Sequence, residues 1–352
     1  MLKSGRMKYL TRVYSYDFIT AGEFMNYSAL NAKIAGMSAK LLSNDDYLSL
    51  CSSRSIHDVY TKLKSYSSYY GMADNGTSTP QQLYLLLDSD FKKIQVFIND
   101  NNTKKYLDSL YMKREISVIK QLLSAIYHGR NYEYMLFSSR IFKEGYAVSF
   151  SRTEDFIEAL RSSRIQDILK SIYKPGIALS EIETSLDLQY YTNLWKAKNR
   201  FLKGVNKDIA GAVNGTEIDL QNITRIYRLK IYYKPMKEYI YRYMLPINYK
   251  LSPEVLMQLI ETESESNLPS LIKNTCYGAY FSKDSTVESF FYETLVSVYE
   301  CIQKRHQNSI APIIYYLFRK ETEIKNVISI LEGINYSMDS SEIMGSVRVY
   351  TQ

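Results

Sequence analysis

Few residues of this chain have the types and spacing that catalysis or metal binding needs. The three histidines lie far apart, at His57, His128 and His306. The three cysteines are odd in number and form no Cys-x-x-Cys pair: Cys51, Cys276 and Cys301. Two acid pairs, Asp45-Asp46 and Asp88/Asp90, have the chemistry to hold a cation, but carboxylates at helix starts also complement the helix dipole. We therefore expect buried free thiols, no disulfide framework and no metal site.

The motifs that identify common catalytic sites are missing from the sequence. It contains no GxxxxGK(S/T) phosphate loop, no GxGxxG, no HExxH and no GxSxG. Phosphate cradles, catalytic zinc and activated serines each depend on one of these arrangements. We expect no catalytic residue and no cofactor, and we predict that the chain is not an enzyme.

The best candidate for an electrostatic surface is a basic stretch made of Arg225, Arg228, Lys230, Lys234 and Lys237. Tyrosines alternate with these cations, and such a pattern could stack nucleic-acid bases. A solvated helix face explains it as well, and we favour that interpretation with Arg225 and Arg228 as candidates for contacts with a protein partner. The net charge of +7 does not decide between these possibilities. A basic helical-repeat scaffold that binds RNA or another protein is the alternative.

The elements that position these residues follow a repeated helical pattern. An acid is followed by apolar residues at +1, +4, +7 and +8, which lie on one face of an α-helix. The pattern begins at Glu115, Asp219 and Glu323, at intervals of 104 residues. We call these three segments the signature helices. Thr216 stands three residues before Asp219, which predicts a capping box at the start of the second one.

Other landmarks recur in the same order. An acid precedes an aromatic residue by three positions in Asp88/Phe91, Asp187/Tyr190 and Glu288/Phe291. Short helices are expected to start near Asp46, Asp155 and Glu254, in segments that end at Tyr66, Tyr173 and Tyr277. Joints at 145–149, 248–252 and 335–339 offer a turn residue, an aromatic and a polar residue that can cap the next helix. We predict an N-terminal extension at 1–22 and helical modules at 23–140, 141–243 and 244–352.

Composition supports an all-α fold. The 352 residues are 45% hydrophobic and include only 7 Pro and 14 Gly, few for a chain rich in β-turns. The longest apolar stretch, near 310–318, is about half of the ~18–20 residues that cross a bilayer. The first 22 residues carry cations but no continuous apolar run, so they predict neither a signal peptide nor a membrane span. We expect a soluble, cytoplasmic protein.

Three parts of the sequence, taken together with the repeated signature, resemble a known family. They are Tyr27…Leu30-Asn31-Ala32-Lys33-Ile34…Met37…Leu42, Asp219-x2-Asn222-Ile223, and Lys320-Glu321-x-Glu323-Ile324-x-Asn326-Val327. In this order, over nearly the whole chain after residue 22, they are similar to the C subunit of bacterial and archaeal V/A-type ATPases, the equivalent of the d subunit of the eukaryotic V-ATPase. The first copy differs because it has Val118 where the others have Asn222 and Asn326.

The resemblance implies a specific architecture and role. It implies a funnel-shaped, all-α protein of three modules around a pseudo-threefold axis. Such a protein would be a socket between the central shaft, made of the D and F subunits, and the membrane ring of proteolipid subunits. It would transmit torque for coupled ion transport on the cytoplasmic face of the membrane, without hydrolysing ATP or spanning the bilayer itself.

Overall fold

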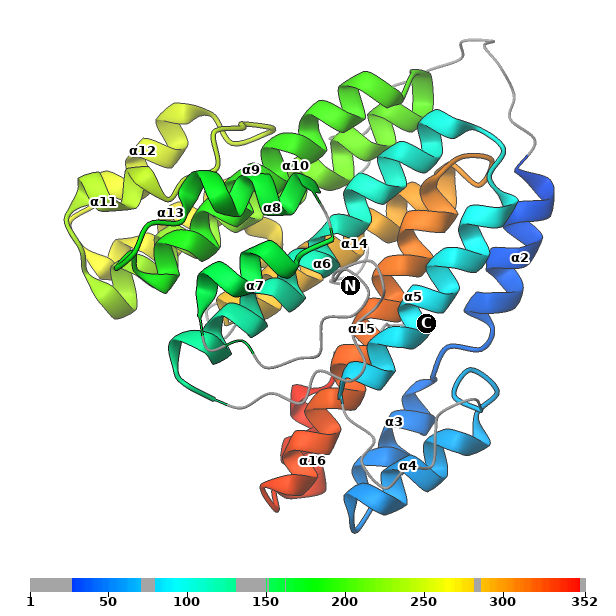
Figure 1. Cartoon of the computed structure of the whole chain (residues 1–352). Coiled ribbons are helices and arrows are strands. Elements are labelled where there is room, and N and C mark those ends of the chain that lie inside the picture. Colours follow the sequence, from blue (N-terminus) through cyan, green and yellow to red (C-terminus); the bar gives the residue numbers. More distant parts are fainter. Residues whose placement is uncertain are drawn as a thin grey trace. The chain divides into compact units, whose positions relative to one another are not determined.

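The computed structural model describes residues 27–70, 80–130, 150, 152–161, 163–281 and 286–348 (Figure 1). The regular elements of this part of the chain are helices, with no strand among them, which confirms the all-α prediction. Contacts divide the chain into two compact units. Unit 1 holds the described residues of 100–132 and 150–311, and unit 2 those of 26–99 and 312–352. The boundaries of the three predicted modules stay a prediction.

The three signature patterns lie inside three long helices. These helices are α6 (Asn101–Tyr127), α10 (Gly204–Arg228) and α15 (Ala311–Asn335). Their patterned apolar positions are buried, except for the half-buried Tyr227, so the periodicity correctly identified the core-facing side. The predicted capping box at Thr216 is wrong. Thr216 is fully buried in the middle of α10, because this helix begins twelve residues earlier at Gly204.

Each signature helix follows another long helix that carries the acid–aromatic landmark. These preceding helices are α5 (Pro80–Phe97), α9 (Leu179–Phe201) and α14 (Val287–Arg305). In unit 1, α9 packs against both α6 and α10, and α10 also packs against α14. Apolar side chains such as Leu194 and Ile223 are buried in unit 1.

Short helix pairs complete the repeat. The pairs are α3 (Asn44–Cys51) with α4 (Ile56–Ser65), α7 (Thr153–Ala159) with α8 (Ser163–Ile172), and α12 (Pro253–Glu261) with α13 (Leu268–Lys273). An acid occupies the first turn of α3, α7 and α12, as predicted. Ser252 caps α12 through the Val255 N–H, and Asp339 forms a capping box for α16 (Ser340–Ser346). The joint at 145–149 lies outside the described residues.

The first described helix belongs to unit 2. Helix α2 spans Ser28–Ser38 and packs on α5, and its Leu30, Ile34 and Met37 side chains are buried. It ends before Leu42, whose N–H bonds to a side chain instead of continuing the helix. Small residues along α2, including Ala32, Ala35 and Gly36, are exposed.

The remaining elements are short. They are η1 (Leu229–Tyr233, a π-helical turn), α11 (Lys237–Arg242), η2 (Glu265–Asn267) and η3 (Gly278–Tyr280). Helix α11 packs against α12 in unit 1. Across the described part of the chain, no helix combines the length and the apolar character needed to cross a membrane.

Candidate functional site

The signature acid of α10 binds the segment that leads into the next helix pair. The buried carboxylate of Asp219 accepts hydrogen bonds from the backbone N–H groups of Tyr249 (3.2 Å), Lys250 (2.7 Å) and Leu251 (3.1 Å). It also accepts one from the Tyr277 hydroxyl, at 2.8 Å. We call Asp219 and these four donors the Asp219 clamp. It attaches both ends of the α12–α13 segment to the middle of α10.

The backbone of α10 allows this close approach because of a glycine. A Cβ atom on Gly215 would lie 2.3 Å from Cγ of the Tyr249 ring, so only glycine leaves room for the ring. Burial raises the pKa of Asp219, and its four hydrogen bonds oppose that rise. Burial and the neighbouring carboxylate raise the pKa of Tyr277, so the tyrosine stays a donor.

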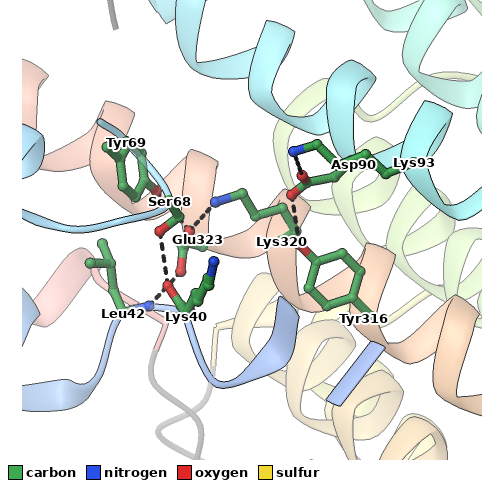
Figure 2. Close-up of polar contacts among 9 residues, drawn as sticks. All are labelled: Lys40, Leu42, Ser68, Tyr69, Asp90, Lys93, Tyr316, Lys320 and Glu323. Carbon is green, nitrogen blue, oxygen red and sulfur yellow. Dashed lines mark hydrogen bonds and ion pairs between the residues drawn. The ribbon is translucent and has the colours of Figure 1, made fainter. Parts of the chain in front are cut away.

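The signature acid of α15 makes an analogous arrangement in unit 2. Glu323 accepts hydrogen bonds from the Leu42 N–H (2.6 Å) and the Tyr69 hydroxyl (2.7 Å), and it pairs with Lys320 Nζ at 2.6 Å (Figure 2). The side chains of Lys320 and Glu323 are only 1% and 2% exposed. Lys320 Nζ also lies 4.6 Å from the centre of the Tyr69 ring. We call this group the Glu323 clamp. It attaches the α3–α4 segment to α15.

A second polar group one turn away joins α5 to α15 in unit 2. The Tyr316 hydroxyl donates to Asp90 at 2.6 Å, and Lys93 pairs with the same carboxylate (Figure 2). Burial and Asp90 raise the pKa of Tyr316. Asp88 and Asp90 lie in the middle of α5, so our interpretation that they mark a helix start is wrong. Asp45 and Asp46 do lie in the first turn of α3, where Asp46 and Ser43 form a capping box.

A buried asparagine follows the signature acid in both clamps. The Asn222 side chain accepts from the Leu245 N–H and donates to the Leu245 carbonyl. Asn326 makes the same pair of bonds with the backbone of Arg348. The first copy has buried Val118 at this place, which can form neither bond. The asparagines thus fix the chain that leaves each of these two signature helices.

The clamp tyrosines correct one landmark of the repeat. Tyr69 and not Tyr66 bonds to Glu323, and intervals of 104 residues separate Tyr69, Tyr173 and Tyr277. In the first copy Tyr173 donates to Glu154 instead, at 2.9 Å. The 104-residue interval contained this signal, but three tyrosines in the 66–70 segment hid the correct register.

The basic stretch is engaged in contacts within unit 1. Its five cations contact Asp187 and the Tyr243 carbonyl (Arg225), Glu288 (Arg228), the carbonyls of Ile260 and Thr262 (Lys230), Glu265 (Lys234) and Glu261 (Lys237). The Arg225 side chain is 15% exposed and shares Asp187 with Lys120 of α6, whereas Arg228 is 51% exposed. The stretch therefore connects α10 and η1 to their neighbours.

The histidines and cysteines are not brought together. His57 and His128 are exposed and His306 is half-buried. Cys51 is a buried free thiol as expected, but Cys276 is exposed. Within the described ranges, no group of three or more His, Cys, Asp or Glu side chains is placed to hold a metal ion.

This geometry defines a class of protein: an all-α scaffold in which acids on long helices anchor short helix pairs. Comparison with known proteins gives the family. The profile of the family described as "ATP synthase (C/AC39) subunit" matches residues 30–346. The chain therefore belongs to this family.

Several archaeal proteins, each named as the C subunit of an A-type ATP synthase, are similar to the chain. The protein of Methanosphaera stadtmanae is 23% identical over 91% of this chain and 87% of its own length. That of Methanococcoides burtonii is 25% identical over 92% and 94%, respectively. That of Methanocaldococcus jannaschii is 23% identical over 90% and 85%. The similarity thus extends over nearly the full length of this chain and of each relative.

Proposed function

We propose that this chain is a non-catalytic adaptor of a V/A-type rotary ATPase. It links the central shaft, made of the D and F subunits, to the membrane proteolipid ring and transmits torque for coupled ion transport. It is a peripheral component on the cytoplasmic face of the membrane and does not hydrolyse ATP. The observation that carries this proposal is the family match over residues 30–346.

The clamps support an arrangement in which a helix pair from one module binds the signature helix of another. Asp219 binds a segment that follows it in the sequence, at 249–251. Glu323 instead binds Leu42, which precedes it by 281 residues. Leu42 and Lys250 hold the same place in the repeat, because two intervals of 104 residues separate them. The segment of the first helix pair, α3–α4, is thus bound by the third signature helix, α15. This pairing is expected for modules around a pseudo-threefold axis.

The same contacts support a mechanical role. A torque-transmitting part must resist deformation, and close-packed helical interiors have low compressibility. The two clamps add buried bonds between elements distant in the sequence, with separations of 30 to 281 residues. Opening either clamp would leave buried polar groups without partners, which is costly. Each clamp therefore resists separation of a helix pair from its signature helix.

The RNA-binding alternative receives little support from the basic stretch. Non-specific nucleic-acid binding requires cations that are available to phosphates. Each cation of the stretch already contacts a carboxylate or a carbonyl of unit 1. A protein partner fits this ion-paired surface better.

Reconstitution tests the proposed function directly. We expect the purified chain to form a 1:1 complex with the D–F shaft, to bind the proteolipid ring in mild detergent, and to lack nucleotide hydrolysis alone. Size-exclusion chromatography with mass measurement reports the first two outcomes. Binding to neither shaft nor ring would refute the proposal. Salt-sensitive RNA binding in their place would favour the alternative.

The candidate partner contacts, Arg225 and Arg228, can be separated by their environments. Reversal of the exposed charge in Arg228→Glu should weaken assembly and leave folding intact if Arg228 contacts a partner. Arg225→Glu places an acid beside Asp187 and is expected to destabilise unit 1 itself. Normal assembly of a folded Arg228→Glu variant would reject a contact role for Arg228.

A further inference from the structure

One end of unit 1 carries cations that are not paired with acids. Their side chains are exposed or half-buried, and none of them forms an ion pair with another residue in the described part of the chain. The segments that contain them, 100–108, 196–208 and 304–311, hold nine basic and three acidic residues, in a chain with a net charge of +7. We call these unpaired residues the cationic end: Lys104, Lys105, Lys196, Arg200, Lys203, Lys207 and Lys304.

Contacts within unit 1 bring the three segments together. The Lys105 ammonium, near the start of α6, and the Arg200 guanidinium, at the end of α9, both lie over the Phe201 ring, 5.8 and 5.4 Å from its centre. The Asn206 side chain, in the first turn of α10, accepts a hydrogen bond from the Ile310 N–H in the segment that follows α14. The cations of the three segments therefore act on one surface.

The start of α10 departs from the usual charge pattern of helices. Partial positive charge at a helix N-terminus favours acids in the first turn, and α3, α7 and α12 follow this rule. Helix α10 has no acid in its first turn, its N-cap is Lys203, and no side chain caps its free N–H groups. Its first acid is Asp208, directly after Lys207. The lysines and the helix dipole thus repel each other here, and a bound anion would relieve this repulsion.

A buried lysine of α9 adds to the positive charge of this end. Lys198 is only 7% exposed, and its ammonium lies 3.4 Å from the centre of the Trp195 ring. Among the described residues no carboxylate pairs with it. Burial and the neighbouring Lys207 lower the pKa of Lys198, and Asp208 opposes this shift. The aromatic ring is therefore its main source of compensation.

The other end of α10 shows that this is a local feature. The cations near its C-terminal end pair with acids of unit 1: Arg225 with Asp187, Arg228 with Glu288, Lys234 with Glu265 and Lys237 with Glu261. The two ends of one helix therefore differ in charge compensation. The basic composition of the chain alone does not explain unpaired cations at only one of them.

The side chains at the cationic end favour carboxylates of a protein over nucleic acid or lipid. Bases bind single-strand sites by stacking on free aromatic faces, but Trp195 and Phe201 already pack against cations. Attachment to a membrane surface usually adds inserted apolar side chains. In the three segments, all of which are described, the one large apolar side chain on the surface is Val205, at 36% exposure. A run of carboxylates needs neither feature and also suits the start of α10.

We propose that the cationic end is a docking surface for an acidic segment of a protein partner. Its carboxylates would pair with the lysines around the start of α10 and with Lys105 and Arg200. The inference goes beyond the proposed function, because this recognition is a property of the isolated chain and needs neither shaft nor ring.

The test measures binding of a fluorescent peptide of about ten glutamates to the purified full chain, by anisotropy at about 50 mM salt. A glutamine peptide, a short RNA and phosphatidylserine vesicles are compared with it. The variant of the cationic end is Lys196→Gln, Lys203→Gln and Lys207→Gln. The matched control removes the same charge from ion-paired lysines of unit 1: Lys170→Gln, Lys234→Gln and Lys237→Gln.

We expect the glutamate peptide to bind the unmodified chain, and to bind the cationic-end variant about tenfold more weakly or worse. The control should change by less than about twofold, because its lysines already have partners. Without peptide, the unfolding temperature of the cationic-end variant should equal or exceed that of the unmodified chain, since repelling charges are removed.

Four results would overturn the inference. They are no peptide binding by the unmodified chain, equal losses in both variants, tighter binding of RNA, vesicles or the glutamine peptide, and a lower unfolding temperature of the cationic-end variant. Reconstitution with shaft and ring tests the proposed function separately, so the two failures are distinguishable.

Discussion

The Asp219 and Glu323 clamps occupy equivalent places in the repeat but stabilise their buried carboxylates differently. Asp219 is held by four neutral donors, three of which are backbone N–H groups. Glu323 is held by one backbone N–H, one tyrosine hydroxyl and a buried ammonium. Both carboxylates end up with their oxygens satisfied. The repeat therefore fixes where the acid lies and what it attaches, and leaves open how its charge is compensated.

Two equivalent positions account for the difference. Lys320 stands 104 residues after Thr216, so one clamp has a cation where the other has a hydroxyl. Lys250 stands twice that interval after Leu42, so the Asp219 clamp has a lysine on the attached segment instead. Each clamp thus has one lysine and one neutral residue at these two places, in opposite order. Substitutions at these positions separate charge from geometry.

The largest effect is expected for Lys320→Met, which keeps the volume and removes the charge. It leaves Glu323 buried without a cation, and breaking a buried pair in this way costs about 3–5 kcal/mol in the free energy of unfolding. Urea denaturation measures the change. The exposed pair Lys325–Glu321 supplies the control, since Lys325→Met should cost at most about 1 kcal/mol.

The double variant Lys320→Met with Glu323→Gln sharpens this prediction. Glutamine keeps an acceptor for Leu42 and Tyr69 and carries no charge, so it should recover most of the lost stability. A double variant no more stable than Lys320→Met would mean that packing, and not the unbalanced charge, explains the cost.

A smaller loss is expected for Asp219→Asn. The four groups that donate to Asp219 are neutral, but the amide NH2 faces donors and one acceptor atom is lost, which costs about 1–3 kcal/mol. Hydrogen exchange at the amides of residues 249–251 should become faster, because these groups lose their acceptor. A cost that exceeds that of Lys320→Met would contradict the distinction between the two clamps.

Asn222 and Asn326 lie three residues after the signature acids, where the first copy has Val118. Their substitution tests whether valine is tolerated at this place. Asn222→Val should cost about 1–2 kcal/mol, since it leaves the buried N–H and carbonyl of Leu245 without partners. Asn326→Val should cost less, because Arg348 is exposed whereas Leu245 is buried, and water can replace the asparagine side chain there. Thermal unfolding of the two variants side by side gives the ranking. Equal costs would mean that burial of the backbone partner does not matter here.

The sequence predicted the elements well and the clamps only in part. Apolar spacing located the buried faces of α6, α10 and α15, and acids located the starts of α3, α7 and α12. Periodicity could not show that Asp219 faces inward, because an acid at the edge of an apolar stripe is normally solvated. It also could not pair Glu323 with Leu42, since a contact between residues 281 apart has no local signal. Periodicity also could not predict the ion pairs of the basic stretch, because its acidic partners lie 24 to 60 residues away in the sequence.

The smallest effect is expected at Lys250, where Lys250→Leu makes the Asp219 clamp resemble the Glu323 clamp. Burial lowers the pKa of the Lys250 side chain from 10.5 to about 8, so its charge is unfavourable in the folded state. Above pH 10.5 the side chain is neutral in both states and the full stability of the folded state is present. The folded state loses stability as the pH falls from 10.5 through 8, because the unfolded chain binds the proton first. The leucine variant should therefore be more stable at pH 7, by about 1 kcal/mol after allowance for partial exposure. That gain should shrink between pH 8 and 10.5. A gain of the same size in urea denaturation at pH 7 and pH 10 would assign it to packing, and a loss at pH 7 would show that Asp219 needs this cation.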